Sequence, residues 1–163
     1  MVKRLKVKGE RLKVKILILN GPNLNMLQYR DPAQYGTRSM EEIILDVQRA
    51  HPDVRFTYRQ SNHEGDLIDW IQEVSLPSLP TGGGEEDGYA GIILNAGGYT
   101  HTSVALRDAV ELCRVPVVEV HLSDIHAREP FRRVSLLTDV TITQFIGKHC
   151  YEEAADYLLT HVG

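Results

Sequence analysis

The chain has 163 residues, of which 42% are hydrophobic and 25% charged, and its formal net charge is −4 at pH 7. This length suits one domain, which can bury enough surface to fold without disulfides or a structural metal. No apolar run approaches the roughly 18 residues of a membrane-spanning helix, and no apolar stretch of signal-peptide type follows the N-terminus. The two cysteines, Cys113 and Cys150, match no metal or redox spacing. We therefore expect a cytoplasmic protein with reduced thiols and no membrane partner.

Positive charge is concentrated at the N-terminus. Residues 1–15 contain seven Lys or Arg and one acid, whereas the remainder contains 11 basic and 21 acidic residues. A basic tail can bind nucleic acid, but such a surface normally interleaves aromatic residues with the cations, and this segment has none. The sequence therefore predicts a basic extension over 1–13, a single domain over 14–163 and no nucleic-acid partner.

Short β-branched runs alternate with helical patterns along the chain. Strands are predicted over 14–20, 54–60, 91–98, 115–121 and 140–147. Helices are predicted over 39–51, where Ser39 and Glu42 form a capping-box pattern, and over 66–74, 103–113 and 151–159. Near-continuous apolar strands indicate burial on both faces, as in parallel sheets. We predict a doubly wound α/β sandwich of three layers, with a flavodoxin-like, five-stranded parallel sheet. The Pro- and Gly-rich segment 75–88 predicts an exposed loop.

Polar residues follow three of the predicted strands. These segments read NGPNLNML from residue 20, NAGGYTHTS from residue 95 and EVHLSD from residue 119. In open parallel sheets, ligands bind outside the carboxyl ends of the strands. We therefore expect the three segments to meet at one edge of the sheet and to form a site there.

Glu119 and His121 are the strongest candidate pair. They stand two positions apart at the end of a predicted strand, so both side chains point to the same face. A neighbouring carboxylate favours the imidazolium form, which suits a general acid at neutral pH. The alternatives are a structural ion pair that ends the strand and a metal site that also recruits His126. The spacing fits no standard zinc motif, so metal binding ranks last.

The segment 20–36 is long for a connection and rich in polar groups, as lids and binding loops often are. It lacks the glycine patterns of a dinucleotide fold or a phosphate loop, so nucleotide binding ranks low. Arg30 precedes Tyr35 by five residues, and a nearby cation favours the ionised phenol that a catalytic base requires. Tyr35 could instead serve only in packing, and the residues alone favour this alternative.

Asn95 stands at a predicted strand end, and the helix that follows directs its N-terminal amides to the same edge, where an anion can bind. His101 could bind a ligand or cap the first turn of that helix. Farther along, Arg128, Arg132 and Arg133 indicate a small anionic substrate, because guanidinium groups suit carboxylates. The alternative is a solvated, charged helix face.

Taken together, these segments resemble type II 3-dehydroquinate dehydratases, the dehydroquinases of the shikimate and quinate pathways. The resemblance runs from about Lys15 to Val162 and rests on LNGPNLNML, RDPAQYG, QSNHEGDLIDWI, ILNAGGYTHTSVALRDA, EVHLSDIHAREPFRR and YEEAADYLL. That family has a flavodoxin-like fold, works without cofactor or metal, and assembles as dodecamers built from four trimers. The resemblance implies a cytoplasmic, homododecameric lyase that dehydrates 3-dehydroquinate to 3-dehydroshikimate.

The resemblance also implies catalytic roles. Tyr35 would remove a proton beside the substrate ketone, with Arg30 keeping it ionised. Asn23 would hold a water that stabilises the resulting enolate. His121, oriented by Glu119, would protonate the departing hydroxyl.

Substrate binding, by the same resemblance, would use the backbone amides of Leu122 and Ser123 and the side chains of Asn95, His101, Asp108 and Arg132. Asp108 would come from a neighbouring subunit, and Arg128 would support the network. The extension 1–13, the long loop 75–88 and an aspartate at position 31 depart from the family pattern. The rival hypothesis is a non-catalytic flavodoxin-like module that binds a small acid or nucleotide and signals. The intact set of candidate catalytic side chains favours the enzyme.

Overall fold

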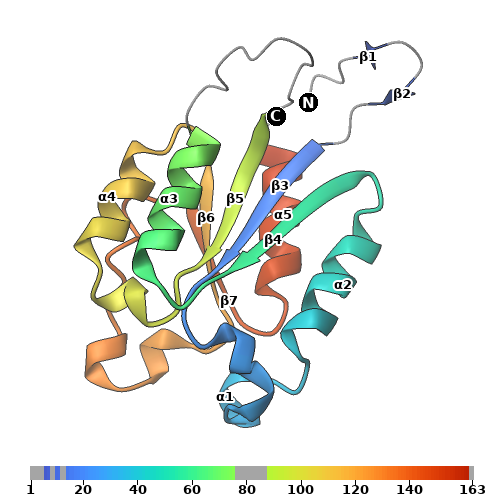
Figure 1. The fold of residues 1–163 in the computed structure, drawn as a ribbon. Coiled ribbons are helices and arrows are strands. Elements are labelled where there is room, and N and C mark those ends of the chain that lie inside the picture. The colour runs from blue at the N-terminus through green and yellow to red at the C-terminus, as the bar shows by residue number, and fades with distance from the viewer. Residues whose placement is uncertain (1–5, 8–9, 12–13, 76–87, 162–163) are drawn as a thin grey trace.

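A five-stranded parallel sheet forms the centre of the molecule (Figure 1). The computed structural model describes residues 6–7, 10–11, 14–75 and 88–161. The strands are β3 (Val14–Asn20), β4 (Val54–Gln60), β5 (Tyr89–Asn95), β6 (Val117–His121) and β7 (Thr143–Ile146). Their order is β4-β3-β5-β6-β7, and every neighbouring pair is parallel. This is the strand order of flavodoxin-like folds, so the predicted architecture is confirmed.

Two further strands, β1 (Lys6–Val7) and β2 (Glu10–Arg11), pair antiparallel with each other outside the main sheet. Most of the predicted N-terminal extension and nearly all of the predicted loop over 75–88 lie outside the described residues. Across the part of the chain that the structure describes, no helix combines the length and apolar character that crossing a bilayer demands.

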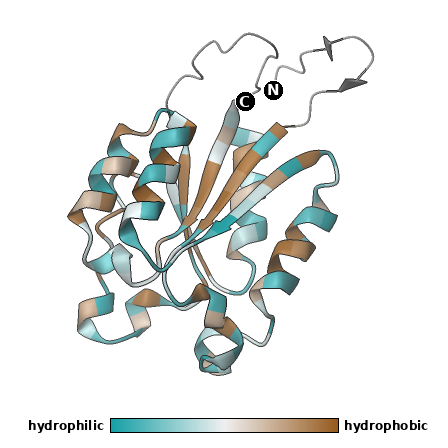
Figure 2. Ribbon diagram, in the orientation of Figure 1, coloured by the Kyte–Doolittle hydropathy of each residue, from teal (hydrophilic) through white to brown (hydrophobic). Residues whose placement is uncertain are grey.

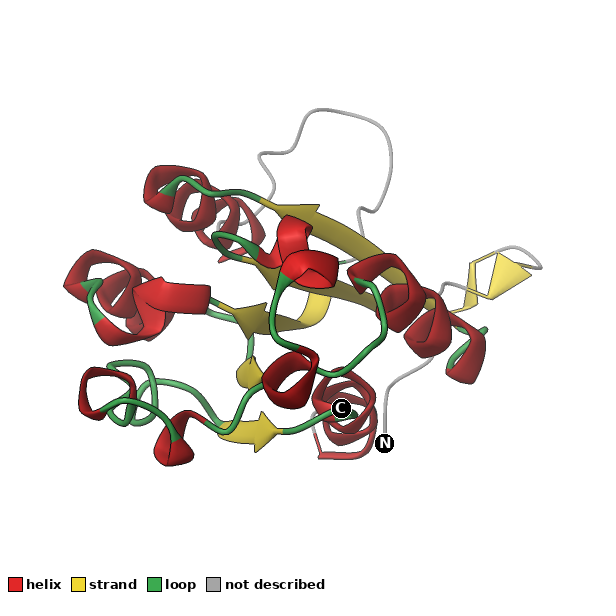
Figure 3. Cartoon of the chain, turned by 90° about the horizontal axis from the view of Figure 1, so that it is seen from below, coloured by secondary structure: helices red, strands yellow, loops and turns green. Residues whose placement is uncertain are grey.

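Helices cover both faces of the sheet (Figures 1 and 3). One face packs against α2 (Met40–Ala50) and α5 (Cys150–His161), and the other against α3 (Glu64–Ser75) and α4 (Val104–Leu112). Alternate residues of β3 serve the two layers: Ile16 and Ile18 join the first core, and Leu17 and Leu19 the second. The apolar strands therefore stand out in brown in Figure 2, as burial on both faces requires.

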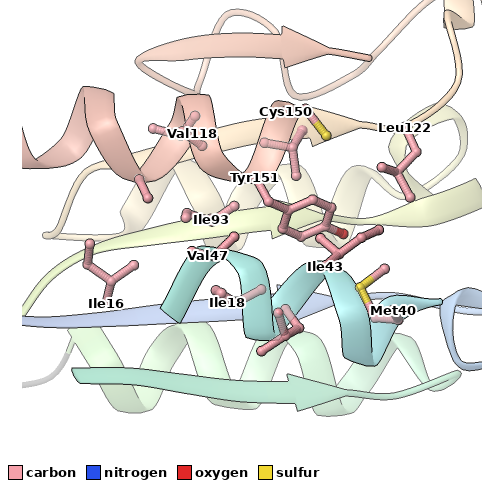
Figure 4. Close-up of a cluster of buried hydrophobic side chains, with 14 of the residues drawn as sticks. Ile16, Ile18, Met40, Ile43, Val47, Ile93, Val118, Leu122, Cys150 and Tyr151 are labelled. Atoms are coloured by element: carbon pink, nitrogen blue, oxygen red, sulfur yellow. The ribbon is translucent and has the colours of Figure 1, made fainter. Parts of the chain in front are cut away.

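The core between the sheet and the pair α2 and α5 contains mostly aliphatic side chains, with Tyr151 among them (Figure 4). Each fully buried Ile or Leu stabilises the fold by roughly 1.5–3 kcal/mol relative to an exposed one. The capping box predicted for α2 is present: the Ser39 hydroxyl accepts from the Glu42 amide, and the Glu42 carboxylate accepts from the Ser39 amide. This cap satisfies backbone donors at the exposed start of α2.

Several strand ends differ from the prediction for local reasons. β5 ends at Asn95 instead of residue 98, because the chain turns into a 3₁₀ helix in which Gly97 has a φ of +59°. β6 begins at Val117 rather than residue 115, since Pro116 has no backbone N–H for the ladder. The last strand is also shorter than predicted, because a hydrogen-bonded turn precedes it.

Short helices gather at the carboxyl edge of the sheet, which Figure 3 views from below. They are η1 (Leu24–Tyr29), α1 (Pro32–Tyr35), η2 (Gly97–His101), η3 (Ile125–Ala127) and η4 (Pro130–Arg132). The Asp31 side chain caps α1 by accepting from the Ala33 amide at 3.0 Å. The segments expected to meet at this edge are thus ordered, short-helical connections.

A substitution at Gly21 tests how closely the chain after β3 must approach the chain after β5 at this edge. A Cβ added there would lie 2.4 Å from the Ala96 carbonyl oxygen, which is backbone and cannot rotate away. We expect Gly21→Ala to lower the free energy of unfolding by about 1–3 kcal/mol, the usual range for overpacking. Urea titration at one protein concentration measures this. Gly65→Ala, in open space on α3, is the control, and an equal loss in both variants would contradict the proposed contact.

Candidate active site

A pocket with about 420 Å³ of open space lies at the carboxyl edge of the sheet. Its lining includes most of the side chains predicted for the site, namely Arg30, Tyr35, Asn95, His101, His121, Leu122, Ser123 and Arg132. The remaining lining residues are Leu24, Gly97, Gly98, Ile125 and Arg128. Residues about 90 positions apart in the sequence therefore meet at one place, because the parallel strands end at the same edge.

Tyr35 lies between two arginines. Its hydroxyl oxygen accepts hydrogen bonds from both Arg30 and Arg128. The guanidinium carbon of Arg30 also lies 4.1 Å from the centre of the tyrosine ring, and that of Arg128 lies 5.3 Å from it. Two guanidinium groups therefore contact the same phenol oxygen. The ring also packs against the apolar core, so the packing role weighed from the sequence is present as well.

His121 and Glu119 lie side by side at the end of β6, as their spacing predicted. His121 Nε2 and Glu119 Oε1 are 2.7 Å apart, and the exposed fractions are 5% for His121 and 0% for Glu119. Ser135 also donates its hydroxyl to Glu119 Oε1. Glu119 sits behind the pocket wall, whereas His121 lines the pocket. The pair is therefore an imidazole presented to the pocket and oriented from behind by a buried carboxylate.

Glu119 carries a charge in an environment that opposes it. Burial alone would raise its pKa, but the hydrogen bond and charge of His121 and the donors Ser135 and Gln144 bring the pKa below the ordinary value of 4.5. Gln144 stands opposite Glu119 in the register of β6 and β7. Gln144 Nε2 and Glu119 Oε2 are both buried, and neither meets the geometry of a hydrogen bond with another described residue.

His101 is the last residue of η2, the short helix that follows β5. Its Nδ1 is 2.7 Å from the Val134 carbonyl oxygen, which can only accept, so Nδ1 carries the proton. Burial, together with the nearby His121 and Arg132, lowers the pKa of His101 below 6.5, although the bond to Val134 acts the other way. At neutral pH His101 is therefore neutral, and its Nε2 is left as an acceptor for a ligand hydroxyl.

Three further predicted residues line the pocket with polar groups. Asn95 is 3% exposed at the end of β5, and its Oδ1 accepts from the Gly97 amide at 3.2 Å. Ser123 accepts from Arg128 at 3.3 Å. Arg132 pairs with Glu129 at 3.0 Å and keeps a guanidinium at the pocket wall. These groups make one side of the pocket suited to an anionic or hydroxylated ligand.

Besides Glu119, two predicted residues lie outside the pocket lining. Asn23 is exposed next to the lining residue Leu24, with a left-handed backbone (φ 68°) and an amide that donates to Asn62. Asp108 is exposed on α4. Asp108 is not among the residues that line the pocket of its own chain.

Arg128 was predicted only to support the network, and Ser135 and Gln144 were not predicted. Arg128 contacts Tyr35 directly, although 93 residues separate them. A polar Gln144 within an apolar strand was an available signal for a buried partner, whereas nothing in the sequence marks Ser135. His126, considered as a metal ligand, is exposed and outside the pocket lining. Over the described residues, no three His, Cys, Asp or Glu side chains are grouped as a metal site would need.

The Glu119 charge should be visible in the pH dependence of stability. Its pKa is depressed in the folded state, so its stabilising contribution is complete above the ordinary value and is lost as the pH falls through the depressed one. We expect Glu119→Gln to lower the free energy of unfolding at pH 7 by roughly 1–3 kcal/mol, and this difference from the wild type to shrink below about pH 4.5. Denaturant titrations from pH 7 to pH 3 measure it, with Glu73→Gln, at an exposed carboxylate, as control. A difference that does not change with pH would contradict the assigned charge.

Comparison with known proteins identifies the family of the chain. The family model for class II dehydroquinases matches residues 14–159. A 3-dehydroquinate dehydratase from an Exiguobacterium species is 47% identical over 135 residues, which are 82% of this chain and 85% of the relative. A second relative, 3-dehydroquinate dehydratase 2 of Pseudomonas putida, is 42% identical over 151 residues, covering 90% of this chain and 93% of the relative.

The fold comparison points the same way. The crystal structure of a type II dehydroquinase from Butyrivibrio crossotus matches with a TM-score of 0.80 and 35% sequence identity, covering 91% of this chain and 99% of that one. The predicted resemblance is confirmed: the chain belongs to the class II dehydroquinase family.

Proposed function

We propose that this protein dehydrates 3-dehydroquinate to 3-dehydroshikimate, a step of the shikimate pathway. Membership of the class II dehydroquinase family supports the reaction. The observation that carries it is the pocket in which Tyr35, contacted by two arginines, and His121, backed by Glu119, line the same small space. A base and an acid from different segments can thereby act on one ring.

Proton removal comes first in the proposed mechanism. The Tyr35 phenolate, stabilised by Arg30 and Arg128, takes a proton from the carbon beside the substrate ketone. The electron pair of that C–H bond moves onto the ketone oxygen and forms an enolate. Asn23, next to the lining residue Leu24, holds the water that donates to the enolate oxygen.

Loss of the hydroxyl completes the reaction. The enolate re-forms the carbonyl as its electrons make the ring double bond and expel the hydroxyl group. His121 donates a proton to that leaving group, so water departs, and Glu119 stabilises the imidazolium beforehand. The proton on Tyr35 returns to His121 through solvent, which restores both groups. Positioned proton transfer of this kind contributes typically 10²–10⁴-fold to a rate.

Substrate binding uses the polar side of the pocket. The backbone amides of Leu122 and Ser123 and the guanidinium of Arg132 bind the substrate carboxylate. His101 accepts from a ring hydroxyl through Nε2, which its hydrogen bond to Val134 leaves free of a proton. Asn95 contributes an N–H donor.

The assembly is part of the proposal. We propose a homododecamer of four trimers, in which Asp108 of one subunit completes the pocket of the next. Its position on α4, exposed and away from its own pocket, supports this arrangement. Both cysteines, Cys113 and Cys150, are free thiols, which fits the reducing cytoplasm that we propose as its location.

Tyr35→Phe tests the assigned base. The change removes only the phenol oxygen, so the fold should persist while kcat falls about 10²–10⁴-fold. Formation of the conjugated enone can be followed by ultraviolet absorbance, with a chelator present throughout. Tyr29→Phe, on the same segment but with a tyrosine that is 75% exposed, should keep wild-type activity. Retention of most activity by Tyr35→Phe would remove it as the base, and a wild type that binds the acid without turning it over would favour the non-catalytic module.

Shared sites can be tested by mixing inactive variants. If Asp108 serves a neighbouring pocket, Tyr35→Phe and Asp108→Ala subunits that are co-expressed should assemble some complete sites. We expect the mixed assembly to recover activity that neither variant has alone, measured by the same absorbance assay. Each variant denatured and refolded alone is the control. No recovery in an assembly shown by mass spectrometry to be mixed would place both residues in one subunit's site.

A further inference from the structure

A hydrogen-bonded group beneath the pocket joins the ends of two strands to α5. Asn20 and Asn95 lie opposite each other in the register of β3 and β5. Ile18 and Ile93, two positions earlier, face the core under α2 and α5, so the asparagines point to the same layer. There the Tyr151 hydroxyl is 2.7 Å from Asn20 Oδ1 and 3.0 Å from Asn95 Nδ2.

All three side chains are buried: Asn20 and Tyr151 have no exposed surface, and Asn95 is 3% exposed. Figure 4 shows Tyr151 among the apolar side chains of this layer. A polar group in such a place costs stability unless it is hydrogen-bonded. The three residues meet this requirement by bonding to one another, and Asn20 Nδ2 also donates to the Tyr58 hydroxyl at 3.4 Å.

The direction of each hydrogen bond follows from the Gly97 amide. A backbone N–H can only donate, so the Asn95 atom 3.2 Å from it is the oxygen, and the nitrogen must face Tyr151. The Tyr151 oxygen accepts from Asn95 and directs its own proton to Asn20. Burial raises the pKa of Tyr151 well above its ordinary value of 10, so this proton stays in place at any working pH.

We propose that Tyr151 is a positioning residue: through its hydroxyl it holds the Asn95 amide so that the second N–H of Asn95 is available to a substrate oxygen in the pocket. Tyr151 itself does not line the pocket, whereas Asn95 does. Without the tyrosine oxygen, the Asn95 amide keeps only the bond from the Gly97 N–H to its oxygen, and its nitrogen loses the buried partner that helps to orient it. This assignment rests on the proposed function, because it takes 3-dehydroquinate as the molecule that Asn95 contacts.

Tyr151→Phe removes only the hydroxyl oxygen that contacts Asn95 and Asn20. We expect KM for 3-dehydroquinate to rise about 3- to 10-fold, as the loss of one oriented hydrogen bond predicts, with kcat changed by less than about twofold, since Asn95 binds and does no proton transfer. Tyr157→Phe is the matched control, because Tyr157 lies on the same helix and packs on Phe145 and His161, away from the pocket lining. It should keep the wild-type KM.

A double variant separates positioning from a general loss of structure. If Tyr151 acts through Asn95, the change from Tyr151 to Phe should add nothing to the KM of Asn95→Ala. Multiplied effects in the double variant, or an unchanged KM in Tyr151→Phe, would overturn the proposal.

A crystal structure of Tyr151→Phe provides a readout that needs no turnover. We expect the Asn95 amide to rotate away from its position in the wild-type protein, and an unmoved amide would overturn the proposal. If the wild type failed to convert 3-dehydroquinate, the proposed function would fall, yet this comparison would still decide whether Tyr151 orients Asn95.

Discussion

Parallel pairing of β3, β5 and β6 brings their carboxyl ends to one edge, and every polar group of the site depends on that register. Asn20 stands beside Asn95, and Leu94 beside Glu119, so the strand ends are level with one another. A slip by one residue would turn the side chains of a strand to the other layer. The double-sided apolar core holds the register, because each strand buries alternate residues against different helices.

Charge is arranged in two separate places around the pocket. Arg30 and Arg128 contact the Tyr35 hydroxyl on one side, whereas Glu119 contacts His121 on the other. Positive groups thus contact the phenol, and a carboxylate contacts the imidazole. The base and the acid of the proposed mechanism are therefore held by different neighbours, although both line one small pocket.

Residues behind the pocket wall also hold the side chains of the site in place. Ser135 and Gln144 stabilise the Glu119 carboxylate from behind, and Tyr151 contacts Asn95 from the core. Side chains that face a ligand are held by neighbours which the ligand does not reach, and this support is what keeps them in one orientation. Burial makes an unpaired polar group costly, which explains why Ser135 and Tyr151 are hydrogen-bonded to the residues they support.

Sequence patterns alone determined the parallel sheet, its flanking helices and most of the pocket lining. These predictions rest on local features: apolar strands, the cap at Ser39 and the polar residues after the strands. Such features depend on residues close together in the chain, so the sequence shows them directly. The spacing of Glu119 and His121 likewise decided that they share a face. Only the tertiary structure decided that Arg128 reaches Tyr35, that Ser135 reaches Glu119 and that Tyr151 joins Asn20 to Asn95. Those contacts join segments whose separation is set by how helices pack on the sheet, and no local pattern along the chain encodes that distance.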